Sequence, residues 1–149
     1  MKLTCTALAI FGFVAAMPAA AQTAGDSTAI RATALDYIEG WYSGSAERMT
    51  RALHPELAKR IMMPNNAENG RRTFQHMTAE TLIGYTRQGG GTRTPPDTRR
   101  MDVRILDVFK GAASVRVDAG DWIDYMHIAR DGDGRWVIVN VLWELRAGG

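Results

Sequence analysis

Four strand-like segments in the second half of the chain constrain its fold more than any other sequence feature. Each combines β-branched and aromatic residues with apolar alternation, and short turns separate them. They span residues 102–109, 113–119, 121–130 and 135–146. Short connections join antiparallel neighbours, so we predict an antiparallel meander. Because both faces of the last segment are largely apolar, we expect that strand to be central and covered on both sides.

The first half of the chain shows helical patterns instead. Apolar residues recur three or four positions apart in the first pattern, namely Ile30, Ala34, Tyr37, Ile38 and Trp41. We predict Asp26 or Ser27 as the cap of this helix. Ser45 and Thr78 are the predicted caps of a second, short helix and of a third helix. Residues 56–63 fit either a helical turn or a first strand. Helices followed by an antiparallel meander predict an α+β fold in one domain.

The N-terminal residues have the features of a secretory signal peptide. Lys2 supplies a positive start, and the apolar run that follows is too short to span a bilayer. Pro18 ends this run and precedes the small residues that a signal peptidase requires. We predict cleavage after Ala21, so that residues 1–21 are removed and residues 22–149 form a secreted or periplasmic domain. The alternative is a buried N-terminal helix.

Composition excludes several function classes. The formal net charge is only +2, and Lys and Arg are not clustered, so we expect no nucleic-acid partner. Cys5 is the only cysteine, which rules out a disulfide framework and a cysteine-based zinc site. The three histidines lie far apart in the sequence and have no cysteine partner. We therefore expect neither a metal nor a cofactor, and no membrane association once the signal peptide is removed.

Asp124 is the most informative polar residue. The residues that share its face in the predicted strand are apolar: Trp122, Met126 and Ile128. This alternation predicts that the carboxylate of Asp124 points inward among apolar groups. A buried carboxylate needs a partner or has a raised pKa. Either a backbone amide or an arginine holds it, or it serves a pocket as an acid, a base or a ligand anchor.

His54 and two aromatic residues are further candidates for a pocket. His54 ends the second helix just before Pro55, where a side chain can face a cavity behind the helix. The alternative is a packing histidine. Tyr37 and Trp41 lie one helical turn apart and form either core or the aromatic wall of a ligand pocket, with the phenol as hydrogen-bond donor. Asp124 and His54 would act as general acid and base only if the fold brings them together.

Several short stretches resemble a known family. Residues 36–49 (DYIEGWYSGSAERM) and 53–55 (LHP) are similar to the opening of the putative lumazine-binding branch of the nuclear transport factor 2-like (NTF2-like) superfamily. Residues 124–128 (DYMHI) and 134–140 (GRWVIVN) are similar to its closing part. Together these motifs extend the resemblance over nearly all of the chain that follows the predicted signal peptide.

The resemblance implies a cone-shaped α+β fold. N-terminal helices would pack in a strongly curved antiparallel β-sheet and leave a pocket at its wide end. The resemblance also implies a homodimer through the outer face of the sheet, which would use apolar residues such as Ile138 and Leu142. Members of the superfamily include ketosteroid isomerases, dehydratases, cyclases and non-catalytic binding modules, so the fold alone does not assign a chemistry.

Eight side chains are candidates for such a pocket. The catalytic candidates are Asp124, His54 and Tyr37, and the ligand-binding candidates are Trp41, Tyr85, Trp122, Met126 and Trp143. Our first hypothesis is an exported protein that binds a small, apolar or aromatic, flat ligand, which the family's description suggests is pterin-like. The second is an isomerase-, dehydratase- or cyclase-type enzyme that uses Asp124 and His54 without a cofactor. The third is an interaction module whose pocket is filled by its own side chains.

Overall fold

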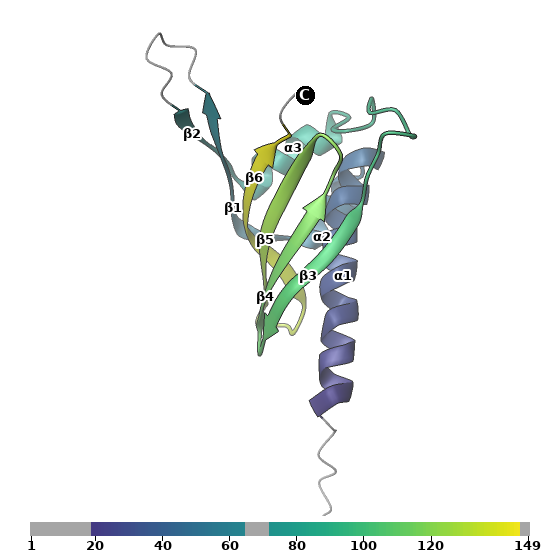
Figure 1. Cartoon of the computed structure of the whole chain (residues 1–149), viewed down its shortest axis with the longest axis vertical. Helices are drawn as coiled ribbons and strands as arrows, with labels where there is room; N and C mark the ends of the chain where they lie inside the picture. The colour runs from purple at the N-terminus through teal and green to yellow at the C-terminus, as the bar shows by residue number, and fades with distance from the viewer. Residues whose placement is uncertain (1–18, 65–71, 147–149) are drawn as a thin grey trace, which may run out of the picture.

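The computed structural model describes residues 19–64 and 72–146. Helices lie against one face of a six-stranded sheet, so the architecture has two layers (Figure 1). The α+β class predicted from the sequence is confirmed. The signal peptide predicted at residues 1–21 lies almost entirely outside the described residues. Within the described ranges, no helix is long and apolar enough to cross a membrane.

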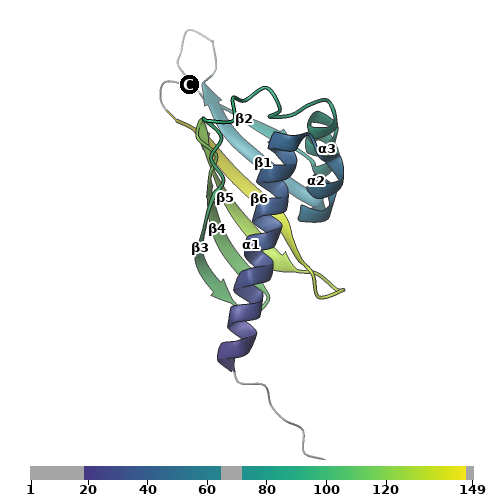
Figure 2. The same cartoon turned by 90° about the vertical axis from the view of Figure 1, so that its right-hand side faces the viewer.

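The long helix α1, Ala19–Ser43, runs along the sheet (Figure 2). It buries the apolar face that the sequence predicts, and three side chains of that face are fully buried: Ile30, Ala34 and Ile38. The predicted cap at Asp26 or Ser27 is wrong, because the helix continues through both residues. The carboxylate of Asp26 pairs instead with the guanidinium of Arg130 in the sheet. Gly44, with a φ of 69°, follows the helix in the left-handed conformation typical of a helix end.

The short helices α2, Ala46–Ala52, and α3, Ala79–Arg87, begin at the predicted caps. The Oγ of Ser45 accepts a hydrogen bond from the backbone N–H three residues later, at 3.3 Å. The Oγ1 of Thr78 accepts the equivalent bond at 3.2 Å. Each bond satisfies one of the amide groups that a helix N-terminus leaves without an internal partner. Both predicted caps are therefore confirmed.

The strands follow the spatial order β2-β1-β6-β5-β4-β3. Their bounds are Leu53–Pro64 (β1), Arg72–Met77 (β2), Asp102–Phe109 (β3), Ala112–Asp118 (β4), Trp122–Arg130 (β5) and Trp136–Leu145 (β6). The four strands predicted in the second half are β3 to β6, and β6 lies inside the sheet as predicted. The prediction that β6 is covered on both sides is wrong, because Leu142 on its outer face is 50% exposed. Residues 56–63, whose sequence fits either a helical turn or a strand, belong to strand β1. The sequence did not predict β2, because five of its six side chains are exposed and show no alternation.

One pair of strands departs from the predicted antiparallel arrangement. β1 and β6 run parallel, with Lys59 beside Val141, so the sheet is mixed. Parallel neighbours require a long crossover connection. The whole stretch of chain between β1 and β6, which contains β2, α3 and the other three strands, supplies that connection. The other four pairs of neighbouring strands are antiparallel.

A bulge in β6 changes which of its side chains face the helices. His127 lies opposite Asn140, whereas the next residue of β5, Ile128, lies opposite Ile138. One extra residue in a strand reverses the alternation of faces beyond it. Ile138 is therefore fully buried in the core, and its predicted place on the outer face is wrong. Leu142, beyond the bulge, is 50% exposed, which fits its predicted place on the outer face.

Candidate functional site

A cavity of about 390 Å³ opens between α1, α3 and four strands of the sheet, β1, β2, β5 and β6. It is lined by Tyr37, Trp41, Lys59, Met77, Leu82, Asp121, Trp122, Trp143 and Leu145. The lining is mostly apolar, and Lys59 and Asp121 are its charged members. Small-molecule sites in proteins measure roughly 300–1,000 Å³ and combine apolar walls with a few polar groups. The cavity has the size and the composition of such a site.

Three tryptophans supply much of the cavity wall. The rings of Trp41 and Trp122 meet edge to face, with centroids 6.5 Å apart and planes at 87°. The backbone N–H of Gly91, in the loop after α3, donates to the carbonyl oxygen of Trp41 at 3.0 Å. A Cβ at Gly91 would lie 2.5 Å from the Nε1 of Trp41, so a larger residue would displace the indole. This glycine therefore helps to fix one wall of the cavity.

A buried ion pair lies at the inner end of the cavity. The Nζ of Lys59 lies 2.5 Å from the Oδ1 of Asp124, and it also donates to the hydroxyl oxygen of Tyr37 at 2.7 Å. The indole N–H of Trp122 donates to the other carboxylate oxygen of Asp124 at 2.8 Å. Lys59 is 4% exposed and Asp124 is fully buried. Both carboxylate oxygens are thus held by donors, as a buried carboxylate requires.

Strand alternation and register bring together Asp124, Lys59 and Tyr37, which come from three different elements. Asp124 lies in β5 opposite Trp143 of β6, on the face that packs against the helices. Lys59 lies in β1, where it alternates with the exposed or half-buried residues on either side of it. Tyr37 reaches the same point from α1. Residues 65 positions apart in the sequence therefore share one ion pair.

Burial controls the protonation of the lysine and the tyrosine. The loss of water around Lys59 lowers the pKa of its amine, and the nearby carboxylate of Asp124 partly opposes that shift. Burial also raises the pKa of the Tyr37 hydroxyl well above its ordinary value, and the Asp124 charge adds to this effect. The Nζ of Lys59 lies 4.8 Å from the ring centroid of Trp143, which is a cation–π distance. The tyrosine therefore stays neutral, while the lysine loses its proton more easily than a solvated amine.

The structure places the eight predicted residues in different surroundings. Four of them line the cavity: Tyr37, Trp41, Trp122 and Trp143. Asp124 lies behind the lining and contacts it through Lys59 and Trp122. Met126 is 1% exposed in the core and is not among the lining residues. Tyr85 is 51% exposed on α3 and is also outside the lining, so its predicted place at the pocket is not found.

The structure does not bring His54 to Asp124. The Nδ1 of His54 accepts a hydrogen bond from the backbone N–H of Glu56 at 3.1 Å. The residue before it pairs with Ile138 of β6, whereas Asp124 pairs with Trp143. At about 3.3 Å per residue, these two positions on β6 are roughly 16 Å apart. The predicted acid–base pair is therefore not formed, because the two residues lie at different levels of the sheet.

Sequence reasoning missed Lys59, the partner of Asp124. Its neighbours two residues away in either direction are Leu57 and Ile61, and both are buried. The alternation Leu57, Lys59, Ile61 was visible in the sequence and marks one buried face of a strand. A lysine between two buried positions needs a counter-charge, and Asp124 was the inward carboxylate available to it. The signal went unused because residues 56–63 also fitted a helical turn.

Metal-ligating residues do not gather at this site. Within residues 19–64 and 72–146, no group of three or more His, Cys, Asp or Glu side chains is placed to hold a metal ion. The polar groups of the cavity are instead an amine, a phenol, indole N–H groups and the carboxylate of Asp121. All of these except the carboxylate are able to donate a hydrogen bond.

Solved structures of low sequence identity share this fold. An NTF2-like protein of unknown function from Methylobacillus flagellatus is 22% identical, with a TM-score of 0.62, over 83% of this chain and 94% of that one. One from Shewanella baltica is 13% identical, with a TM-score of 0.61, over 84% and 97% of the two chains. One from Silicibacter pomeroyi is 16% identical, with a TM-score of 0.60, over 83% and 98%. These likenesses establish the cone-shaped NTF2-like fold.

A family model identifies the branch of the superfamily. No curated protein matches the chain. The model described as putative lumazine-binding matches residues 25–144, which include every element from α2 to β5, most of α1 and all but the last residue of β6. Both the helical first half and the stranded second half therefore fit the same pattern. The chain belongs to the putative lumazine-binding family of NTF2-like proteins.

Proposed function

We propose that this protein binds a small, flat, mostly apolar ring compound in the cavity beside Lys59. The observation that carries the proposal is an apolar cavity with aromatic walls and a single amine at its inner end. Aromatic walls favour flat rings by stacking and edge contacts. An isolated polar group in such a wall fixes the orientation of a ligand.

The amine of Lys59 favours a ligand with a carbonyl oxygen. An ammonium group has three N–H donors. Within the described residues, two of them are directed at Asp124 and Tyr37. The third is available to an acceptor in the cavity that Lys59 lines. A pterin-like molecule such as lumazine combines a flat ring system with carbonyl oxygens, which agrees with the family's description.

Tryptophan fluorescence during a titration with lumazine tests this proposal. Three of the four tryptophans line the cavity, so ligand binding should change the emission. We expect Trp143→Ala to weaken binding about tenfold, which corresponds to roughly 1.4 kcal/mol of lost contact. Tyr85→Ala is the matched control, because it removes an aromatic ring that lies outside the cavity.

The proposal fails if lumazine leaves the emission of the folded protein unchanged at millimolar concentration. It also fails if Trp143→Ala and Tyr85→Ala bind lumazine as tightly as the unmodified chain does. The second result would place any binding outside the cavity. Circular dichroism of each variant separates lost binding from lost folding.

The geometry favours binding over the two alternative functions. Asp124 is fully buried behind the lining and His54 lies elsewhere, so the two residues cannot act together as the acid and base that the predicted enzyme requires. An interaction module with a filled interior does not account for a cavity of about 390 Å³. The binding function needs only the wall and the donor that the cavity provides.

We also propose that the protein is exported and forms a homodimer. The apolar run and the small residues near the N-terminus support export. Tyr125 and Leu142 are neighbours across β5 and β6 and are 48% and 50% exposed, which supports a contact through the outer face of the sheet. Secretion of a tagged chain with loss of residues 1–21, and sedimentation velocity, test these two proposals.

A further inference from the structure

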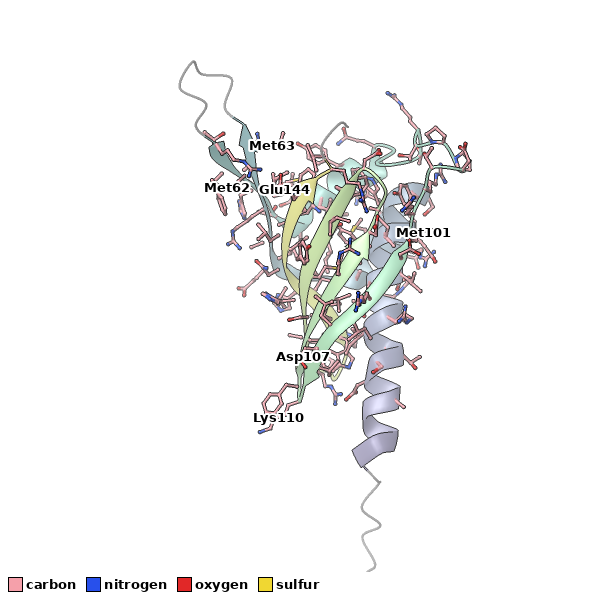
Figure 3. The ribbon with its side chains drawn as sticks, viewed as in Figure 1. Met62, Met63, Met101, Asp107, Lys110 and Glu144 are labelled. Atoms are coloured by element: carbon pink, nitrogen blue, oxygen red, sulfur yellow. The ribbon has the colours of Figure 1, made fainter. Side chains whose placement is uncertain are left out.

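Lys59 has surroundings unlike those of a surface lysine. The chain contains three lysines, Lys2, Lys59 and Lys110. Lys59 is 4% exposed and lines an apolar cavity, so a molecule in that cavity can reach its Nζ. Lys110 lies at an exposed turn between β3 and β4, at one end of the sheet (Figure 3). The same molecule therefore carries both a cavity amine and a solvated amine.

We propose that Lys59 forms an imine with an aldehyde or ketone group of a ligand held in the cavity. This inference rests on the proposed function, because the ligand must first occupy the cavity. Three observations carry it: Lys59 lines the cavity and its Nζ contacts the lining residues Tyr37 and Trp143, a carboxylate lies 2.5 Å from that Nζ, and the other lining groups are mostly apolar. A desolvated lysine beside a proton acceptor is the usual arrangement for an amine nucleophile.

Asp124 supplies the place to which the amine's proton moves. Only the neutral amine has a free electron pair for attack on a carbonyl carbon. At 2.5 Å, a proton can pass directly from the Nζ of Lys59 to the Oδ1 of Asp124. Burial lowers the pKa of the Lys59 amine, which favours this transfer. The donor from Trp122 keeps the carboxyl group oriented toward the amine during this exchange.

The addition then balances without any further reagent. The nitrogen's electron pair forms a C–N bond to the carbonyl carbon, and the carbonyl oxygen takes up a proton from that nitrogen. The resulting hydroxyl group leaves as water after it receives the proton held by Asp124. The nitrogen forms a C=N bond and keeps one proton. The products are a protonated imine, one water molecule and the Asp124 carboxylate, so mass and charge are unchanged overall.

The site can stabilise this product. The protonated imine carries a positive charge where the ammonium group was, and the carboxylate of Asp124 remains beside it. The ring of Trp143, with its centroid 4.8 Å from Nζ, adds a cation–π contact. The hydroxyl group of Tyr37, at 2.7 Å from Nζ, lies within reach of the oxygen that leaves. The same groups that hold the free lysine therefore also fit the imine.

Reductive trapping with 2-naphthaldehyde tests the proposal on the whole chain. Sodium cyanoborohydride at neutral pH converts an imine to a stable amine, and peptide mass spectrometry locates the label. The cavity holds the aldehyde beside Lys59, and burial lowers the pKa of its amine, whereas Lys110 is exposed at a turn. We therefore expect Lys59 to be labelled at least about tenfold faster than Lys110. This comparison needs no variant, because both lysines belong to one molecule.

Two variants and a non-reactive analogue complete the design. Asp124→Asn should slow labelling of Lys59 and leave labelling of Lys110 unchanged, whereas Lys110→Arg should leave labelling of Lys59 unchanged. Calorimetric titration with 2-naphthalenemethanol, which has no carbonyl group, measures occupancy of the cavity alone.

Two outcomes overturn the inference in distinguishable ways. If 2-naphthalenemethanol binds but Lys59 is labelled no faster than Lys110, the imine is ruled out and the binding function stands. If neither the alcohol nor lumazine binds, the proposed function fails, and the inference that rests on it fails as well.

Discussion

Lys59 and Asp124 carry opposite charges in a part of the molecule from which water is largely excluded. Removing two charges from water costs free energy, and a well-packed apolar pair of similar size is often at least as stable. The ion pair is therefore weak evidence of stabilisation. It does place an amine in an otherwise apolar wall, where the amine can orient a ligand.

Removal of one partner of this pair should cost more stability than removal of both. Lys59→Met leaves the carboxylate of Asp124 buried without its cation, and we expect the free energy of unfolding to fall by about 3–5 kcal/mol. Asp124→Leu leaves the ammonium group of Lys59 buried without its anion and should also be destabilising. Lys59→Met combined with Asp124→Leu removes both charges, and this double variant should lose less than either single variant. Urea unfolding measures the three values.

Lys110→Met is the matched control for this cycle. It removes the charge of an exposed lysine, so its free energy of unfolding should stay within about 0.5 kcal/mol of the unmodified value. If the loss in the double variant equals the sum of the two single losses, Lys59 and Asp124 are energetically independent. That result would contradict the claim that Lys59 and Asp124 form a buried ion pair.

For single residues, the sequence predicts which way a side chain points better than it predicts which residue the side chain contacts. The inward direction of Asp124 follows from the alternation in one strand, and the structure confirms it. Its partner Lys59 lies 65 residues away, and the distance between them depends on the register of β1 against β6. That register cannot be predicted from the residues of either strand alone. The same limit applies to His54 and Asp124, because only the register of the sheet shows that the two residues lie apart.

Among the elements, the junction between α1 and α2 is fixed by one carboxylate. Asp36 of α1 accepts hydrogen bonds from the Nε of Arg48 at 2.9 Å and from the Nε of Arg51 at 2.7 Å. These arginines lie on α2, and the bond from Arg51 is the largest cause of the lowered pKa of Asp36. Gly40 allows the close approach, since a Cβ there would lie 3.1 Å from the backbone nitrogen of Met49.

Asp36 should make the stability of this junction depend on acid. Its pKa is lowered in the folded protein, so its contribution is present above pH 3.8 and is lost as the pH falls through the folded value. We expect Asp36→Asn to lower the free energy of unfolding by about 1 kcal/mol at neutral pH, with no difference at the acid end. Urea unfolding across this pH range checks the prediction.

Asp97→Asn, at an exposed loop position, is the control for the acid series and should follow the unmodified chain at every pH. A constant difference between Asp36→Asn and the unmodified chain from neutral to acid pH would contradict the assigned role, because a proton-linked contact must vanish when the carboxylate is protonated.

Features that depend on a few consecutive residues, such as helix caps, are predicted correctly. Features that depend on how one strand pairs with another, such as a bulge, are not. The caps at Ser45 and Thr78 are chemical signals within a few residues, and both are correct. The bulge between Asn140 and Ile138 has no such signal, because both faces of β6 are apolar and a shifted alternation is equally apolar. A strand whose two faces are both apolar in sequence leaves the register undecided.

In the whole molecule, the cavity exists because helices and sheet enclose a space that their side chains do not fill. α1 lies along the sheet and α3 lies near one end of it (Figure 2). The resemblance to NTF2-like proteins predicts this arrangement, and the family match and the solved structures confirm the fold. The identity of the ligand depends on a few side chains, such as Lys59, that a fold does not specify.

A crystal structure of the protein with lumazine is the most direct test of the central claim. We predict density for the ring system between Trp41, Trp122 and Trp143, with a ring oxygen within hydrogen-bond distance of the Nζ of Lys59. Lumazine bound outside this cavity, or a cavity closed by its own side chains in the crystal, would contradict the account.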